Sequence, residues 1–374
     1  MAGALLSQAH RKTRANPQTL PPARVQTTYP RVTIMEENGS RHENDSSSAE
    51  EGDQEPAETD AVLTVKHLPG FGHGIVRKLS DSGFSNLRAL AILSTRMLQE
   101  QSGIGDKIAQ KIIQSARELC KIEFQTADGV FEKRKRLGRI TTGSAALDEL
   151  LGGGIECGAI TEIVGEFRTG KTQIAHQACL NVQLPLDRGG LGGRALYIDT
   201  ESTFRPERLV QMAIGMKIDV KEALKNVIYG RAFNIEHQIT IIKQARQLVE
   251  ARGIKLLVID SIINHFRAEY LGLGTLGPRQ QLLNMHLHQI QQLVDTYGIA
   301  AVVTNQVLAK PEIVFGNPVQ PAGGNIIAHC STYRLQLRKG NGDTRIARII
   351  DAPGLPEAEA AFRLTEKGVQ DVDG

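Results

Sequence analysis

Short apolar runs alternate with longer amphipathic stretches over most of the second part of the chain. The runs have the length of β-strands and lie at 159–164, 194–200, 256–260, 299–304 and 332–338. Helical stretches separate them, and such alternation is typical of an α/β fold whose sheet is largely parallel. The pattern therefore predicts one α/β core over residues 140–374.

The segment 61–120 shows a different pattern, that of several short helices with an internal repeat. A glycine–apolar–glycine turn before an apolar helix face occurs at Pro69–Gly72 and, 33 residues later, at Ser102–Gly105. Such a turn brings the backbone close to a ligand while helix N–H groups face outward, which suits a phosphate. The segment resembles a helix-hairpin-helix pair, a sequence-independent DNA-binding module, and its helices carry four basic residues: Arg77, Lys78, Lys107 and Lys111. The alternative is a small helical domain whose glycines only permit tight turns.

Charge is distributed unevenly over residues 1–60. Residues 1–35 carry five basic residues and no acid, whereas residues 36–60 carry ten acids and one arginine. Charge blocks with little apolar content predict a disordered tail over 1–60. The basic start is compatible with a targeting peptide of the mitochondrial type, and equally with translation that begins at Met35.

The composition excludes several classes of protein. The 374 residues include 41% hydrophobic and 23% charged residues, and the net charge is only +3. The four cysteines lie far apart without a C-x-x-C pair, which argues against a disulfide framework or a cysteine zinc site and fits a reducing compartment. No apolar stretch approaches the roughly 18–20 residues of a membrane helix. We therefore expect neither a secreted nor a membrane-spanning nor a collagen-like protein, and no membrane among its partners.

The most specific motif is a phosphate-binding loop that follows the apolar run at 159–164. Its residues match the pattern G-x-x-x-x-G-K-[ST]: Gly165, Glu166, Phe167, Arg168, Thr169, Gly170, Lys171 and Thr172. A strand precedes the motif and a helix is expected from about Gln173, which is the context that the motif requires. Backbone N–H groups of such a loop surround phosphates, the lysine neutralises β/γ oxygens, and the hydroxyl of Thr172 reaches Mg²⁺. The motif predicts ATP as a ligand.

Two carboxylates at strand ends are candidates for the remaining chemistry of this site. Asp260 ends the apolar run at 256–260 and is expected to hold the metal together with Thr172. Glu201 follows the run at 194–200, and we interpret it as the base for the attacking water because strand C-termini line the ligand crevice of such sheets. The alternative for Glu201 is a glutamate that faces solvent.

Together with the phosphate loop, four further segments resemble one family: Asp199–Glu201, Phe204–Arg208, Thr304–Gln306 and Gly324–His329. It is the RecA-type recombinases, in particular the archaeal RadA group and its eukaryotic counterparts, and the similarity covers residues 61–374. The segments 351–357 and 358–371 look more archaeal, whereas Arg168 and Thr169 look more like the eukaryotic form.

The resemblance implies an enzyme, a DNA-dependent ATPase that forms helical filaments on single-stranded DNA and catalyses homologous pairing and strand exchange in DNA repair. It implies that Glu201 and Lys171 act in catalysis, that Gln306 senses the γ-phosphate, and that Arg208 stacks on the adenine. It further implies that His329 relays the nucleotide state, and that Asp351 and Glu357 cap the ATP of the adjacent subunit with K⁺. Taken alone, Gln306 reads as a strand-end hydrogen bonder and His329 as a core histidine.

Two glycine-rich stretches are expected to form loops that bind DNA. Residues 267–279 contain Arg267 and Arg279, and residues 308–327 contain Lys310, Gly323 and Gly324. Long loops inside a compact domain are often functional, and backbone amides with a few cations can follow phosphates without reading bases. The sequence departs from the family at Leu273, where the family usually has arginine.

Residues 121–139 are predicted to link the module to the core. Phe124 and Ala127 in this linker resemble the F-x-x-A oligomerisation motif of the family, in which an extended segment joins the next subunit's sheet. Such head-to-tail contacts generate a helical filament or ring. The alternatives are an ordinary linker and, for the basic run at 133–136, a solvated hinge, a nuclear signal or a phosphate-binding patch.

Two other functions remain as alternatives to the recombinase. One is a non-catalytic recombinase paralogue that regulates or loads another filament, and the other is a hexameric helicase or clock-type ATPase with the same core fold. The expected partners are single- and double-stranded DNA and further copies of the chain. The expected localisation is cytoplasmic, at the nucleoid, for an archaeal protein and nuclear for a eukaryotic one.

Overall fold

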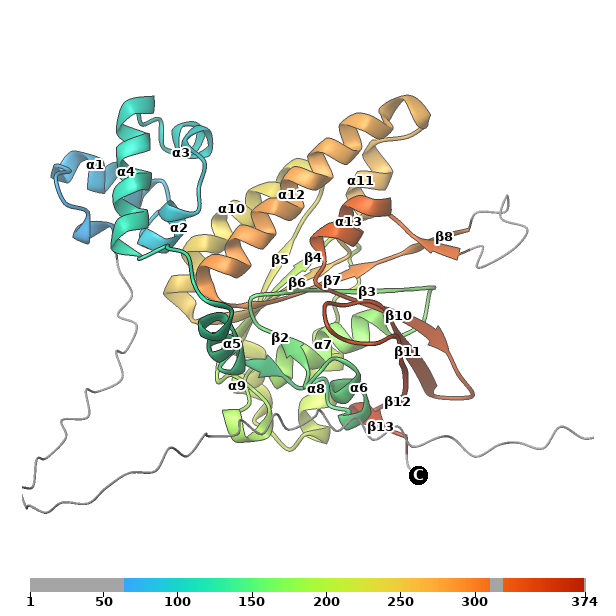
Figure 1. The fold of residues 1–374 in the computed structure, drawn as a ribbon. Coiled ribbons are helices and arrows are strands. Elements are labelled where there is room, and N and C mark those ends of the chain that lie inside the picture. Colours follow the sequence, from blue (N-terminus) through green and yellow to red (C-terminus); the bar gives the residue numbers. More distant parts are fainter. Residues whose placement is uncertain (1–63, 310–318, 373–374) are drawn as a thin grey trace, which may run out of the picture. The chain divides into compact units, whose positions relative to one another are not determined.

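The computed structural model of the chain describes residues 64–309 and 319–372. The segment 1–60, expected to be a tail, and Lys310, expected to bind DNA, lie outside the described residues. A small helical module and an α/β core succeed one another along the described chain (Figure 1).

The helical module consists of short helices: η1 (Val65–His67), α1 (His73–Asp81), α2 (Leu87–Ala91), α3 (Thr95–Ser102) and α4 (Asp106–Leu119). Their apolar sides meet in a core with fully buried side chains: Leu79, Phe84, Leu98 and Ile112. Each repeated turn precedes a helix, since α1 follows Gly72 and α4 follows Gly105. Lys78 Nζ donates to Gly103 O over 2.9 Å, which ties the first repeat to the turn of the second. The predicted all-helical module is therefore present.

The connecting segment contains a helix that the apolar pattern does not reveal, α5 (Ala127–Lys135), because none of its residues is buried. Arg134 nevertheless reaches Glu156, whose side chain is 2% exposed, with an Nη2–Oε1 distance of 3.0 Å. Arg139 donates to the same carboxylate over 2.7 Å. Arg134 therefore pairs with the charge of buried Glu156 within a run that is exposed at all four positions, and the interpretation of 133–136 as a solvated hinge stays a prediction.

A nine-stranded sheet forms the centre of the core, with the order β13-β12-β11-β10-β3-β7-β6-β4-β5. The strands from β10 to β5 run parallel to one another, and β11, β12 and β13 continue the sheet in antiparallel fashion. The strands are β3 (Ile160–Gly165), β4 (Arg194–Asp199), β5 (Val227–Arg231), β6 (Ile254–Asp260), β7 (Ala300–Asn305), β10 (Tyr333–Lys339), β11 (Thr344–Asp351), β12 (Glu359–Thr365) and β13 (Gly368–Asp371). All five predicted runs are strands of this sheet, and the mostly parallel core is confirmed.

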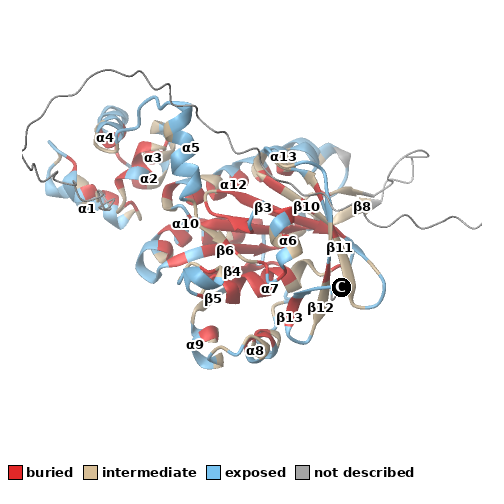
Figure 2. Ribbon diagram, turned by 60° about the horizontal axis from the view of Figure 1, so that its bottom comes forward, coloured by how far each residue is buried: buried red, intermediate tan, exposed pale blue. Residues whose placement is uncertain are grey.

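Helices cover both faces of the sheet (Figure 1). They are α6 (Ala145–Leu150), α7 (Lys171–Asn181), α8 (Pro206–Gly215), α9 (Val220–Lys225), α10 (Ile235–Arg252), α11 (Asn264–Glu269), α12 (Leu276–Tyr297) and α13 (Gly324–Cys330), with the short turns η2 (Leu186–Arg188) and η3 (Leu273–Thr275). Tyr197 of β4 packs on the α7 side and Leu196 on the side of α10 and α12, as alternating strand side chains do. Figure 2 shows these central strands buried, which explains their continuous apolar runs. Within the two described stretches, no helix is long and apolar enough to cross a membrane.

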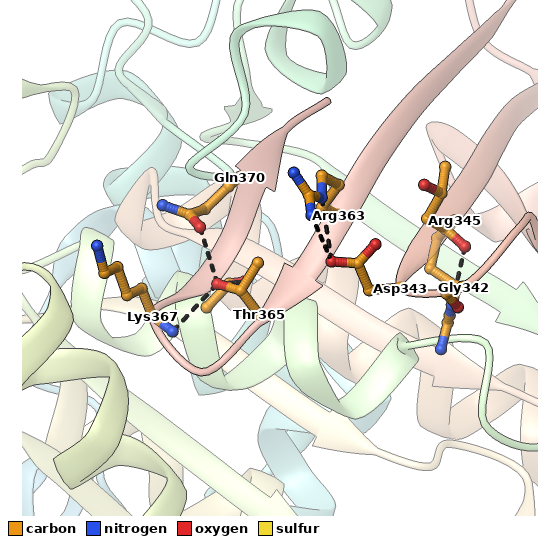
Figure 3. A network of polar contacts seen from close by, with 9 residues as sticks. Gly342, Asp343, Arg345, Arg363, Thr365, Lys367 and Gln370 are labelled. Atoms are coloured by element: carbon orange, nitrogen blue, oxygen red, sulfur yellow. Dashed lines mark hydrogen bonds and ion pairs between the residues drawn. The ribbon is translucent and has the colours of Figure 1, made fainter. Parts of the chain in front are cut away.

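Polar contacts hold together the antiparallel end of the sheet (Figure 3). Arg363 of β12 pairs with Asp343 before β11 at 3.0 Å, and Thr365 Oγ1 donates to Gln370 Oε1 of β13 over 2.8 Å. These strands are half-exposed and carry charges between their apolar residues. The search for apolar runs therefore missed them.

Both stretches that were expected to be loops contain regular structure. Arg267 lies in α11 and Arg279 in α12, so only residues 270–275 connect these helices. Beyond the core strands, β8 (Val307–Ala309) pairs with β9 (Val319–Pro321), and Gly324 begins α13. The prediction of structureless loops over 267–279 and 308–327 was therefore wrong at the ends of both. Their helical segments are short or weakly amphipathic, which hid them from a search for periodicity.

Candidate active site

The phosphate loop lies between the end of β3 at Gly165 and the start of α7 at Lys171. Gly170 has φ 107° and Arg168 has φ 65°, so the loop turns through left-handed backbone. A Cβ atom on Gly165 would lie 2.7 Å from Leu337 O, and one on Gly170 would lie 2.6 Å from Leu364 Cδ1. Space therefore requires glycine at position 165, and the left-handed backbone favours it at position 170, which agrees with the motif.

Lys171 places its ammonium group inside the curve of this loop. Its Nζ donates to Gly165 O over 2.8 Å and to Glu166 O over 2.9 Å. Burial lowers the pKa of Lys171, and the charges of Asp260 and Glu201 oppose that shift. A cation held partly out of water beside the N-terminus of an α-helix is suited to a polyphosphate.

Asp260 ends β6 beside the phosphate loop and is held by three hydroxyl groups. Its Oδ2 accepts from Thr172 Oγ1 over 2.8 Å and from Tyr197 Oη over 2.7 Å. Its Oδ1 accepts from Thr304 Oγ1 of β7. Hydroxyl and carboxylate oxygens are hard ligands, and Mg²⁺ is commonly bound by one or two such groups plus phosphate oxygens and water. The residues present therefore fit Mg²⁺ with ATP.

A chain of hydrogen bonds starts at Glu201, directly after β4. Glu201 Oε1 accepts from Gln306 Nε2 over 2.6 Å and from Ser261 Oγ over 2.6 Å. Gln306 Oε1 in turn accepts from Arg267 Nη1 over 2.5 Å. The predicted base, the predicted γ-phosphate sensor and a predicted DNA-binding arginine are thus joined to one another.

Arg208 of α8 joins the phosphate-loop helix to the C-terminal strands. Its Nε donates to Gln173 Oε1 of α7 over 2.6 Å, and its Nη2 donates to Thr365 O over 2.6 Å. A third bond runs from Nη1 to Glu366 O over 2.8 Å. The planar guanidinium is thus fixed beside Gln173, the residue that directly follows the phosphate loop.

Other predicted residues lie apart from this cluster. Asp351 ends β11 and Glu357 follows it, both exposed, and Glu357 Oε2 pairs with Arg348 Nη2 at 2.6 Å. Among the contacts of the described residues, none joins either carboxylate to the phosphate loop. An exposed position is what a group needs if it is to reach the nucleotide of a neighbour.

Most of the remaining predicted residues are exposed or lie at helix ends, and Thr169 is buried in the phosphate loop. Phe124 is fully exposed and Ala127 begins α5. His329 is exposed on α13, which excludes the alternative of a core histidine. Gly323, with φ 84°, and Gly324 form the start of α13.

The side chains of the phosphate loop differ in exposure. Phe167 is 80% exposed, and the Arg168 guanidinium lies 5.3 Å from its ring. Thr169 Oγ1 donates to Glu166 O.

Among the residues that contact the predicted set, four were given no role in the sequence analysis: Gln173, Tyr197, Ser261 and Thr304, of which Thr304 was noted only as part of the segment Thr304–Gln306. Tyr197 and Thr304 carry polar groups on apolar strands. Gln173 directly follows the phosphate loop, and Ser261 directly follows Asp260. A buried polar group generally has a hydrogen-bond partner, so Tyr197 and Thr304 inside apolar runs were signals that could have been used.

Comparisons with known proteins agree with this geometry. The model of the Rad51 family matches residues 133–372, and the model of the SAM-like helix-hairpin-helix tandem matches residues 62–118. The chain is 48% identical over 310 residues to the DNA repair and recombination protein RadA of Aeropyrum pernix, which covers 83% of this chain and 97% of that protein. The chain belongs to the Rad51 family.

Proposed function

We propose that this protein is a DNA-dependent ATPase and recombinase that assembles on single-stranded DNA and carries out homologous pairing and strand exchange in DNA repair. Its relative in Aeropyrum pernix is a DNA repair and recombination protein. The single observation that carries the proposal is the chain from Arg267 through Gln306 to Glu201, because it links a segment expected to bind DNA to the phosphate-loop site. An ATPase whose rate depends on DNA needs such a link.

The nucleotide site uses few side chains. The backbone of Gly165–Thr172 surrounds the phosphates, and Lys171 neutralises the β and γ oxygens. Thr172 and Asp260 would hold Mg²⁺, which would supply positive charge against the negative charge that develops during hydrolysis. Arg208 supports the adenine from the place where Gln173 and the carbonyl groups of Thr365 and Glu366 fix it.

Glu201 is the base for hydrolysis. Its carboxylate takes a proton from the attacking water. In this structure the same carboxylate accepts hydrogen bonds from Gln306 and Ser261. Both bonds end on Oε1, where they take up positions from which a water molecule would otherwise donate. We therefore expect Gln306 to turn towards the γ-phosphate when ATP and DNA are bound, which frees Glu201.

Assembly completes the site between subunits. Asp351 and Glu357 cap the ATP of the adjacent subunit with a bound K⁺, and Glu357 then leaves Arg348. Phe124 and Ala127 of the segment 121–139 attach to the neighbour, since a fully exposed phenylalanine gains by burial. Arg267, Arg279, Lys310, Gly323 and Gly324 follow the DNA backbone, and His329 transmits the nucleotide state.

We further propose the division 1–60 tail, 61–120 DNA-binding module, 121–139 linker and 140–374 ATPase core. Electron microscopy with ATP and single-stranded DNA tests the whole proposal, with Lys171→Ala as the control that lacks the phosphate contact. A long helical filament that forms with the parent chain and not with Lys171→Ala is expected. Isolated particles would favour a regulatory paralogue, and closed rings on DNA would favour a helicase.

A further inference from the structure

We infer that Tyr197 is a positioning residue for the metal site: its hydroxyl fixes the orientation of the Asp260 carboxylate that receives Mg²⁺. The inference rests on the proposed role of Asp260 as a metal ligand. It assigns a function to a tyrosine that lies outside the phosphate loop and the strand of Asp260.

The register of the sheet brings the two groups together. β4 and β6 are parallel neighbours in which Tyr197 lies opposite Val258 and Asp199 opposite Asp260. The Tyr197 side chain therefore starts two residues earlier than Asp260 and runs along the sheet towards it. Its Oη donates to Oδ2 over 2.7 Å.

Hydroxyl groups from both neighbouring strands hold the carboxylate. Tyr197 of β4 binds Oδ2, and Thr304 of β7 binds Oδ1. The terminal torsion of an aspartate has a broad energy profile, so the carboxylate has no strong orientation of its own. Thr172 is the third donor, and its oxygen is also expected to bind the metal. Tyr197 and Thr304 have no such second task and serve to fix the plane of the carboxylate.

The tyrosine ring is packed against two other rings. Tyr197 is fully buried, and its ring lies 5.3 Å from the ring of His176 and 4.8 Å from the ring of Phe204. His176 is fixed in turn by a contact of 2.8 Å between its Nδ1 and Thr172 O, at the start of the phosphate-loop helix. An ionised carboxylate only accepts hydrogen bonds, so the Tyr197 hydroxyl acts as the donor in its contact with Asp260.

The competing explanation is that Tyr197 only fills the core. Tyr197→Phe separates the two, because it keeps the ring and its stacking and removes only the hydroxyl. Tyr229→Phe is the matched control, since Tyr229 Oη also donates to an aspartate, Asp199 Oδ2, over 3.2 Å, and that carboxylate lies on β4 away from Thr172. Thr304→Val tests the opposite side of the same carboxylate.

The measurement is metal affinity rather than turnover alone. Mn²⁺ binding followed by electron paramagnetic resonance, and Mg²⁺ titration of a bound fluorescent ATP analogue, are recorded for each variant. Loss of a hydrogen bond to a metal ligand typically weakens metal binding 10–100-fold, so we expect Tyr197→Phe to weaken Mg²⁺ and Mn²⁺ binding about 10-fold. Saturating Mg²⁺ restores the ATPase rate of this variant, and Tyr229→Phe binds metal as the parent does.

Two outcomes overturn the inference. Unchanged metal affinity in Tyr197→Phe is one, whatever happens to its melting temperature. An equal loss in Tyr229→Phe is the other, because it would mean a general loss of stability. Asp260→Asn tests the proposed metal ligand separately. If Asp260→Asn binds Mn²⁺ as the parent does, Asp260 is not the metal ligand, and both its proposed role and the inference about Tyr197 are wrong. If Tyr197→Phe does not fold, Thr304→Val decides by the same readout.

Discussion

Gln306 Nε2 donates to Glu201 Oε1 over 2.6 Å, so the residue expected to sense the γ-phosphate already holds the residue expected to activate water. Arg267 holds the other end of the same amide. A change at any member of this chain alters the hydrogen bonding of the next one. The ATPase rate is therefore expected to depend on residues that do not touch the nucleotide.

Glu201→Gln should keep ATP binding and lower turnover. An amide cannot take the proton of the attacking water, and removal of a general base typically costs about 10²–10⁴-fold in rate. Binding of a fluorescent ATP analogue and phosphate release in the presence of DNA measure the two effects. Hydrolysis at the parental rate would show that Glu201 is not the base.

Arg267→Gln should uncouple DNA binding from hydrolysis. The variant loses the contact with Gln306, so we expect a smaller stimulation of the ATPase even at saturating DNA. Arg279→Gln is the matched control: Arg279 on α12 makes no hydrogen bond or ion pair with the described residues. Arg279→Gln should reach the parental ATPase rate, but at a higher DNA concentration. If both variants differ from the parent only in the DNA concentration they require, Arg267 acts as a phosphate contact alone.

Phe124→Glu should keep the fold and prevent assembly. The Phe124 side chain is fully exposed, so its replacement removes no buried contact and should leave the melting temperature unchanged. A glutamate that enters an apolar pocket of the neighbour would cost several kcal/mol. Light scattering should show monomers. Phe131→Glu, at a second exposed phenylalanine, is the control, and large assemblies of Phe124→Glu would contradict the role of the segment 121–139.

The free energy of unfolding should fall in mild acid because of His286. Burial lowers the pKa of His286 on α12 to about 3. The unfolded chain binds this proton below about pH 6.5 and the folded chain does not, so stability decreases by about 1.4 kcal/mol per pH unit between these values.

Urea unfolding near pH 7 and near pH 5.5 measures this decrease in the free energy of unfolding, of which His286 should contribute roughly 1 kcal/mol. His286→Leu should lose less stability between the two conditions. Part of the loss remains because burial also lowers the pKa of His176. An identical acid loss in His286→Leu and the parent would exclude His286 as the cause.

The sequence predicted the central strands and the phosphate loop because both are local. A strand buried on two faces is a continuous apolar run, and the loop has fixed residue spacing. β5, β11 and β12 escaped because charged residues interrupt their apolar positions, and β13 escaped because it has only four residues. Their places depend on partners far away along the chain, such as Asp343 for Arg363.

The candidate site was predicted in its parts and not in its connections. The motifs gave Lys171, Asp260, Glu201 and Gln306, but hydrogen bonds between residues some hundred positions apart follow only from the strand order. Gln306 and Glu201 meet across the sheet because β7, β6 and β4 are neighbours. The same order brings Tyr197 to Asp260, which no spacing along the sequence indicated.

The bond between Lys78 and Gly103 has a consequence for counterion release from DNA. Of the four basic residues that suggested DNA contact, Lys78 is used inside the module and Arg77 lies 3.7 Å from Asp81. Lys107 and Lys111 on α4 have no such partner among the described residues. Each phosphate neutralised on duplex DNA steepens the dependence of log affinity on log salt by about 0.9, so we expect these four residues together to displace roughly two cations rather than four.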